Sequence, residues 1–138
     1  MTDRSFVDTN VFVYADDRDA GEKRTRARTL LGRVLREPGT VVSTQVLQEY
    51  FATATRKLGL PAIAARHRVA LLGRLDIVTM GLDDVLGAID LHRLHSLSIW
   101  DALIVRAALI SGCQTLYTED LPDGQRFESL RVVNPFAA

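Results

Sequence analysis

Short apolar runs alternate along this chain with longer segments in which apolar residues recur at helical spacing. This alternation is typical of a parallel sheet wrapped by helices, because adjacent parallel strands need a crossover, usually a helix, between them. The apolar runs predict strands at residues 5–7, 40–42, 77–79, 115–117 and 131–133. The sequence therefore predicts an α/β fold with three layers, α/β/α, around a central, mainly parallel sheet of four to five strands.

Helical periodicity fills the segments between these strands. A first helical turn is expected at residues 11–14, and helices are expected at 22–36, from 43 or 44 onward, at 62–75, after 83 and from 98 to 111. The helix at 22–36 is predicted to bury an apolar stripe, made of Ala27, Leu30, Leu31, Val34 and Leu35. Trp100, in the last and most apolar helix, is interpreted as a packing residue.

A single domain is expected to span residues 1–138. No Gly/Ser-rich or Pro-rich linker divides the chain, and 47% of its residues are hydrophobic, enough for a core without disulfides or metals. The one cysteine, Cys113, has no partner in the chain, which predicts an inert core residue and a reducing, cytoplasmic location. No run of about 18 apolar residues occurs, so neither a membrane span nor secretion is expected.

The charges balance overall but not locally. Residues 1–69 carry 12 Lys and Arg against 8 Asp and Glu, and residues 70–138 carry 5 against 9. Arg24, Arg26 and Arg28 give the helix at 22–36 a basic face. This face is either a solvated surface or a contact for RNA phosphates or for an acidic segment of a partner protein.

Carboxylates follow or adjoin several of the predicted strands. In open α/β sheets ligands bind beyond the carboxyl ends of the strands, so Asp8 and Asp120 fall where a site is expected. Glu49 lies in the first turns of the helix after the second strand, and Asp101 lies in the first turn of the most apolar helix. Helix capping and turn formation are the alternative explanations for Asp8 and Asp120.

Asp101 and Glu49 differ in how well their surroundings argue for function. Ser98 and Asp101 have the spacing of a capping box, yet a carboxylate in so apolar a helix needs a partner, and a metal ion is one candidate. Arg106, five residues along, lies on a different face of the helix and does not supply that partner. Glu49 lies on the border of its helix's buried stripe, so a solvated surface position is its default explanation.

Converging carboxylates would repel one another unless protons or a cation offset their charge. Two such charges about 4 Å apart repel by up to ~4 kcal/mol at an effective dielectric near 20. Hard oxygen ligands with neither His nor Cys among them favour Mg²⁺ or Mn²⁺ over Zn²⁺. Such an ion would activate a water for phosphodiester hydrolysis, so no side-chain nucleophile is required.

Four segments, in chain order, carry a family resemblance. They are Phe6-Val7-Asp8-Thr9-Asn10-Val11, Gln48-Glu49-Tyr50, Trp100-Asp101-Ala102-Leu103-Ile104 and Leu116-Tyr117-Thr118-Glu119-Asp120-Leu121. Together they resemble the PIN-domain ribonucleases, and most of all the VapC-type toxins of bacterial toxin–antitoxin pairs. The resemblance implies a Mg²⁺-dependent (or Mn²⁺-dependent) endoribonuclease that is the toxin of a type II system, is restrained by a cognate antitoxin and forms a homodimer.

The same resemblance implies roles for particular residues. Asp8, Glu49, Asp101 and Asp120 would form the catalytic, metal-binding site, and Asn10 and Thr118 would orient its first and last acids. The chain departs from many relatives in having Thr118-Glu119-Asp120-Leu121, so either Glu119 or Asp120 could face the metal, although the Thr-x-Asp spacing favours Asp120.

Two other function classes compete with the nuclease. A receiver-type phosphoacceptor domain has a similar size and alternation, but it needs a lysine late in the sheet, and both lysines here, Lys23 and Lys57, lie in the first half. A non-catalytic PIN-like module that binds RNA or protein without cleavage is the main alternative.

Overall fold

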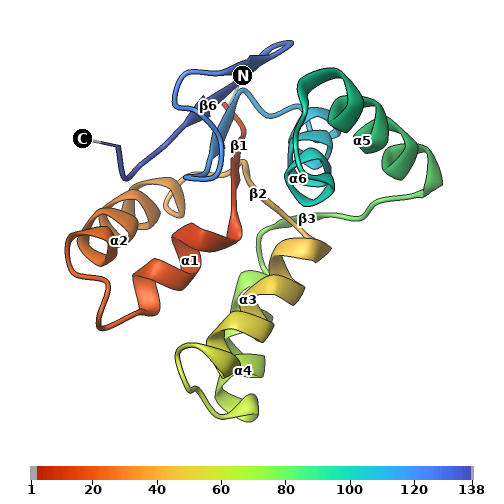
Figure 1. Ribbon diagram of the computed structural model, residues 1–138. Helices are drawn as coiled ribbons and strands as arrows, with labels where there is room; N and C mark the ends of the chain where they lie inside the picture. The colour runs from red at the N-terminus through yellow and green to blue at the C-terminus, as the bar shows by residue number, and fades with distance from the viewer. Residues whose placement is uncertain (1–2, 138) are drawn as a thin grey trace.

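The structure, a computed structural model, describes residues 3–137. Its elements are β1 (Ser5–Val7), α1 (Thr9–Asp16), α2 (Glu22–Val34), β2 (Thr40–Ser43), α3 (Thr44–Arg56), α4 (Ala62–Leu72), β3 (Asp76–Val78), α5 (Leu82–His95), α6 (Ile99–Ile110), β4 (Thr115–Tyr117), β5 (Arg126–Phe127) and β6 (Leu130–Val133). In Figure 1, α1 and α2 lie on one side of the sheet, and α5 and α6 lie on the other. The predicted three-layer α/β/α fold is therefore confirmed.

The sheet of the described residues has the strand order β3-β2-β1-β4-β6-β5. All neighbouring strands are parallel except β5 and β6, so the sheet is mainly parallel, as predicted. It exceeds the predicted four to five strands by the two-residue strand β5 (Arg126–Phe127). So short a strand leaves no apolar run in the sequence, and it exists only because it pairs with β6.

The first helix is longer than predicted because Asp8 caps it. The sequence predicts one turn at residues 11–14, whereas α1 spans Thr9–Asp16. The backbone of Asp8 is extended, and its side chain accepts a hydrogen bond from the N–H of Thr9. Strand β1 thus passes into α1 without a loop, which places Asp8 at the carboxyl end of the central strand β1.

Fewer apolar residues in and just after α2 are buried than the apolar pattern predicts. In α2 the side chains of Ala27, Leu30 and Val34 are buried, but Leu35 is 44% exposed. Leu35 lies just beyond the last turn of α2, where the chain leaves the helix. Cys113 is buried as predicted, and burial raises the pKa of its thiol to about 11, so it remains an uncharged thiol at neutral pH.

The interpretation of Trp100 as a packing residue is wrong. Its side chain is 63% exposed, because it lies in the first turn of α6, before the run of buried residues that starts at Ala102.

Arg106, farther along α6, pairs with Asp84 of α5 at 3.1 Å. Within residues 3–137, no helix combines the length and apolar character that crossing a membrane requires.

Candidate active site

Asp8 is a buried carboxylate at the carboxyl edge of the sheet. Its side chain is 4% exposed, and Val7 before it is paired with Tyr117 of β4. The residue that follows each of these paired strands therefore reaches the same edge, and Thr118 lies beside Asp8. The Thr118 hydroxyl donates to Oδ2 of Asp8 at 2.8 Å, and the N–H of Thr9 donates to Oδ1 at 2.7 Å.

Asp120 is positioned by two polar neighbours. Its N–H donates to the hydroxyl oxygen of Thr118 at 3.1 Å, and the Asn10 amide nitrogen donates to its Oδ2 at 3.1 Å. Asn10, expected beside the first acid, thus contacts the last one, Asp120, and Thr118 contacts both the Asp8 carboxylate and the Asp120 backbone. The Oδ1 atom of Asn10 is buried, and it has no hydrogen-bond partner among the described residues.

Glu49 joins these acids from the facing helix α3 (Thr44–Arg56). The hydroxyl of Thr9 donates to its Oε1 at 2.7 Å, and the Gln45 amide lies 3.4 Å from its Oε2. Its default explanation as a solvated surface residue therefore does not hold. Thr9, between two predicted site residues, bridges α1 and α3, a role that no pattern in the sequence reveals.

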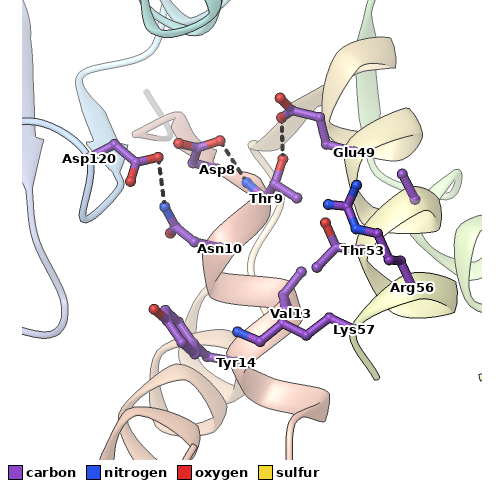
Figure 2. Close-up of a pocket in the computed structure, with 11 residues that line it drawn as sticks. Asp8, Thr9, Asn10, Val13, Tyr14, Glu49, Thr53, Arg56, Lys57 and Asp120 are labelled. Atoms are coloured by element: carbon purple, nitrogen blue, oxygen red, sulfur yellow. Dashed lines mark hydrogen bonds between the residues drawn. The ribbon is translucent and has the colours of Figure 1, made fainter. Parts of the chain in front are cut away.

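A pocket of about 390 Å³ lies between α1 and α3, and the acids gather at one end of it (Figure 2). The described residues that line it are Asp8, Thr9, Asn10, Val13, Tyr14, Glu49, Ala52, Thr53, Arg56, Lys57 and Asp120. Three of the four predicted acids therefore share one cavity. The fourth, Asp101, does not line it.

Asp101 lies at the margin of this group. After burial, the Asp101 charge is the next cause that raises the pKa of Asp120, which places Asp101 near that carboxyl. The Ser98 hydroxyl caps α6 by accepting the Asp101 N–H at 3.1 Å, which is one half of the predicted capping box. The other half, a bond from the Asp101 carboxylate back to Ser98, is not among the hydrogen bonds of residues 3–137, so this carboxylate stays available for another role.

The structure separates Glu119 from Asp120. Lys23 Nζ lies 2.9 Å from Oε2 of Glu119, and the Tyr14 hydroxyl donates to its Oε1 at 2.5 Å. Glu119 is thereby held in an ion pair, whereas Asp120 lines the pocket. Of the two alternatives that the sequence leaves open, Asp120 is the one that faces the pocket.

Burial is the largest cause of the raised pKa values of Asp8 and Asp120. Burial raises the pKa of Asp8 from 3.8 to about 7, against the hydrogen bonds from Thr118 and Thr9, which lower it. Burial also raises the pKa of Asp120, and the nearby Asp101 carboxylate raises it further. Without a cation, therefore, these side chains do not all ionise freely near neutral pH.

The donor atoms of the pocket suit a hard divalent cation. They are carboxylate oxygens together with the unpaired Oδ1 of Asn10, and among the described lining residues there is neither His nor Cys. Within residues 3–137, however, no three Asp, Glu, His or Cys side chains are placed to hold one ion together. The residues thus fit Mg²⁺, which typically takes one or two carboxylates and keeps several waters.

The basic face predicted on α2 (Glu22–Val34) is partly occupied by internal contacts. Arg26 pairs with Glu22 at 2.9 Å, and the Arg28 Nε donates to the Ala15 carbonyl at 2.7 Å. The Nε of Arg24 is buried without a partner among the described residues. The cations inside the pocket are instead Arg56 and Lys57, which the sequence analysis did not select. Glu49, Thr53 and Arg56 recur at helical spacing, and this is the signal that would have indicated them.

The model of the PIN domain family matches residues 5–121 of the chain. This span contains Asp8, Glu49, Asp101 and Asp120. No curated protein matches the chain.

Several solved structures share the fold. VapC20 of Mycobacterium tuberculosis, a toxin that cleaves the sarcin-ricin loop, is 21% identical, with a TM-score of 0.68 over 81% of this chain and 86% of that chain. A toxin–antitoxin complex from Klebsiella pneumoniae is 19% identical, with a TM-score of 0.71 over 97% and 99%. VapBC2 from Rickettsia felis, bound to a DNA fragment from its promoter, is 18% identical, with a TM-score of 0.63 over 93% and 96%.

Proposed function

The chain belongs to the PIN-domain family, and from that premise we propose that it is a Mg²⁺-dependent endoribonuclease, the toxin of a type II toxin–antitoxin pair. The observation that carries the proposal is the pocket in which Asp8, Glu49 and Asp120 meet at the carboxyl edge of the sheet. All three structural neighbours above are toxins or toxin–antitoxin complexes, and one of them cleaves the sarcin-ricin loop. These relationships support the same function for this chain.

Asp8 and Asp120 are the proposed main ligands of the ion, with Glu49 and Asp101 at its margins. Mg²⁺, or Mn²⁺ in its place, would supply a water of lowered pKa and would stabilise negative charge developing on the phosphate. An oxygen-only donor set and a pocket open to solvent are compatible with this chemistry, and no side-chain nucleophile is needed.

The chain's own contribution is to hold these acids in position. Thr118 and the Thr9 amide fix both oxygens of Asp8, and Asn10 fixes one oxygen of Asp120. Locked carboxylates lose little conformational freedom when an ion and a substrate arrive, which is what a preorganised catalytic site requires.

Three partners belong to this proposal. RNA is the substrate, a cognate antitoxin is the inhibitor, and a second copy of the chain completes a homodimer in the cytoplasm. An antitoxin could inhibit by placing a basic side chain among the carboxylates of Asp8, Glu49 and Asp120, where it would take the place of a cation.

A non-catalytic PIN-like module is the alternative, and RNA cleavage separates the two. Purified protein is incubated with total RNA in Mg²⁺ or in EDTA, beside Asp8→Asn and a matched control, Asp90→Asn, which alters an exposed acid of α5. The nuclease predicts cleavage with Mg²⁺ by the wild type and the control, and none in EDTA or by Asp8→Asn. RNA binding that needs no metal and produces no cleavage would instead support the module.

The role of Asp101 has its own test, since this residue does not line the pocket. Expression of the wild-type toxin should arrest growth, and Asp101→Ala should relieve the arrest if its carboxylate helps to hold the ion. Asp101→Ala as toxic as the wild type, at equal protein level, would remove Asp101 from the site.

A further inference from the structure

The pocket that holds the acids also holds two cations. Arg56 is the last residue of α3, Lys57 follows it, and both line the pocket that contains Glu49. In Figure 2 both charged ends point into the pocket, that of Arg56 toward Thr9 and Glu49 and that of Lys57 toward Tyr14. The pocket therefore holds two cations beside its acids.

These two cations are only weakly engaged within the chain. Among the ion pairs of residues 3–137, none involves Arg56. Lys57 Nζ lies 3.9 Å from the Asp17 carboxylate, at the limit of an ion pair, and its side chain is 57% exposed. Lys23, by contrast, is held at 2.9 Å by Glu119. Arg56 and Lys57 are thus free to bind an external anion.

The backbone positions of Glu49 and Arg56 on α3 are separated by more than the rise of one nucleotide. Glu49 and Arg56 lie two helical turns apart, which corresponds to about 10.5 Å along the axis. Successive phosphates of one strand advance by about 3.4 Å along a duplex. The cations therefore start from a different level of α3 than Glu49 does, which suits contact with a phosphate next to the one at the acids.

The two cations would offset the repulsion between the carboxylates of the pocket and the phosphates of RNA. The carboxylates of Asp8, Glu49 and Asp120 repel every phosphate that approaches them, and cations within the same pocket offset that repulsion. We propose that Arg56 and Lys57 bind an RNA phosphate flanking the scissile one and so position the strand. This inference rests on the proposed ribonuclease function and names positioning residues for it.

Salt dependence of RNA binding tests the inference without cleavage. A fluorescein-labelled single-stranded RNA is titrated with protein in EDTA over a series of KCl concentrations, and anisotropy gives the affinity. For single strands each neutralised phosphate adds about 0.7 to the slope of log K against log salt, so Arg56→Gln/Lys57→Gln, which loses one phosphate contact, should lower that slope by about 0.7. In Mg²⁺, KM for cleavage should rise without a matching fall in kcat.

A matched variant separates a local contact from a change in net charge. Arg93→Gln/Arg126→Gln removes two exposed arginines, on α5 and β5, that do not line the pocket, and it should leave the slope unchanged. Arg56→Lys should retain the wild-type slope, and melting curves show that each variant is folded. Equal slopes for the two double variants would overturn the inference.

The remaining outcomes distinguish the inference from the function on which it rests. A wild type that cleaves RNA, together with a pocket variant that binds RNA with the wild-type slope, rejects the inference alone. Were that variant to lose affinity for the antitoxin instead, the cations would serve a protein partner, which also rejects it. A wild type that neither binds nor cleaves RNA rejects both.

Discussion

The hydroxyl of Thr118 donates a 2.8 Å hydrogen bond to Asp8, a residue 110 positions away in the sequence. The two meet because β1 and β4 are adjacent parallel strands whose last residues, Val7 and Tyr117, are paired. The same hydroxyl accepts the N–H of Asp120. One side chain therefore positions both acids that stand at the strand ends.

Removal of the Thr118 hydroxyl should destabilise the ionised carboxylate of Asp8 relative to its protonated form. In Thr118→Val the shape is kept but the hydrogen bond that lowers the pKa of Asp8 is lost, so that pKa should rise by about one unit. Activity near pH 7 should then fall by about fivefold, because the ionised fraction of Asp8 falls from about one half to about one tenth. The pH–rate profile measures this, and Thr118→Ser should restore it. A Thr118→Val profile that coincides with that of the wild type would show that the hydroxyl does not act through Asp8.

Asp8 should make the metal-free protein less stable as the pH rises. Its pKa is about 7 in the folded state and 3.8 when unperturbed, so the folded state binds the proton more tightly. The contribution of this group to stability is fully present below about pH 4 and is lost as the pH rises through about 7, and it amounts to at most about 4 kcal/mol. Asp8→Asn should reduce this pH dependence.

Urea unfolding at pH 5 and pH 8 in EDTA measures that change. The quantity to compare is the loss of unfolding free energy between the two pH values, in the wild type and in Asp8→Asn. Groups far from Asp8 titrate equally in both proteins and cancel, so the difference reports Asp8 together with the Asp120 and Glu49 carboxylates that act on it. Equal losses in the two proteins would contradict a raised pKa at Asp8.

Mg²⁺ should stabilise the folded protein more at pH 8 than at pH 5.5. A cation binds the ionised acids, and at the lower pH it must first displace the proton from Asp8, whose pKa is about 7. An ion at a hundred times its Kd adds about 2.7 kcal/mol of stability. Thermal melting with MgCl₂, against KCl of equal ionic strength, should show the difference. The site assignment fails if Asp8→Asn gains as much from Mg²⁺ as the wild type does.

The sequence predicts most of the fold because the alternation of strands and helices fixes which strand ends share an edge. That argument indicates Asp8 and Asp120, since Asp8 directly follows β1 and Asp120 lies in the segment just after β4. It does not reveal Glu49, whose place in the pocket depends on the packing of α3 against α1 and on its bond to Thr9. Helical periodicity alone makes Glu49 a surface residue.

The apolar pattern of the sequence also did not predict the exposure of side chains at the ends of helices. Trp100 is apolar and lies in an apolar helix, so periodicity favours a packing role, yet the first turn of α6 extends beyond the core. Arg56 and Lys57 read as solvated charges, because only the tertiary structure shows that they line a cavity. Sequence patterns indicate the average environment of a helix, whereas the exposure of these residues depends on where each helix begins or ends relative to the core.

The choice between Glu119 and Asp120 also needed the tertiary structure, and it leads to a paired prediction. Glu119 is held by Lys23, 96 residues away, and by Tyr14, whereas Asp120 faces the pocket. Asp120→Asn should therefore lower Mg²⁺-dependent cleavage by roughly a hundredfold, through loss of a ligand. Glu119→Gln should keep most of the activity, because it changes only a partly exposed ion pair.

Melting temperatures distinguish this assignment from its reverse. Glu119→Gln should lower the melting temperature slightly, with or without Mg²⁺, because the Lys23 pair does not involve the ion. Asp120→Asn should raise it in EDTA, since a carboxyl whose pKa is raised by burial and by Asp101 is replaced with a neutral group, and it should reduce the gain from Mg²⁺. The opposite pattern, with Glu119→Gln inactive and insensitive to Mg²⁺, would mean that the Lys23 pair opens and that Glu119 is the ligand.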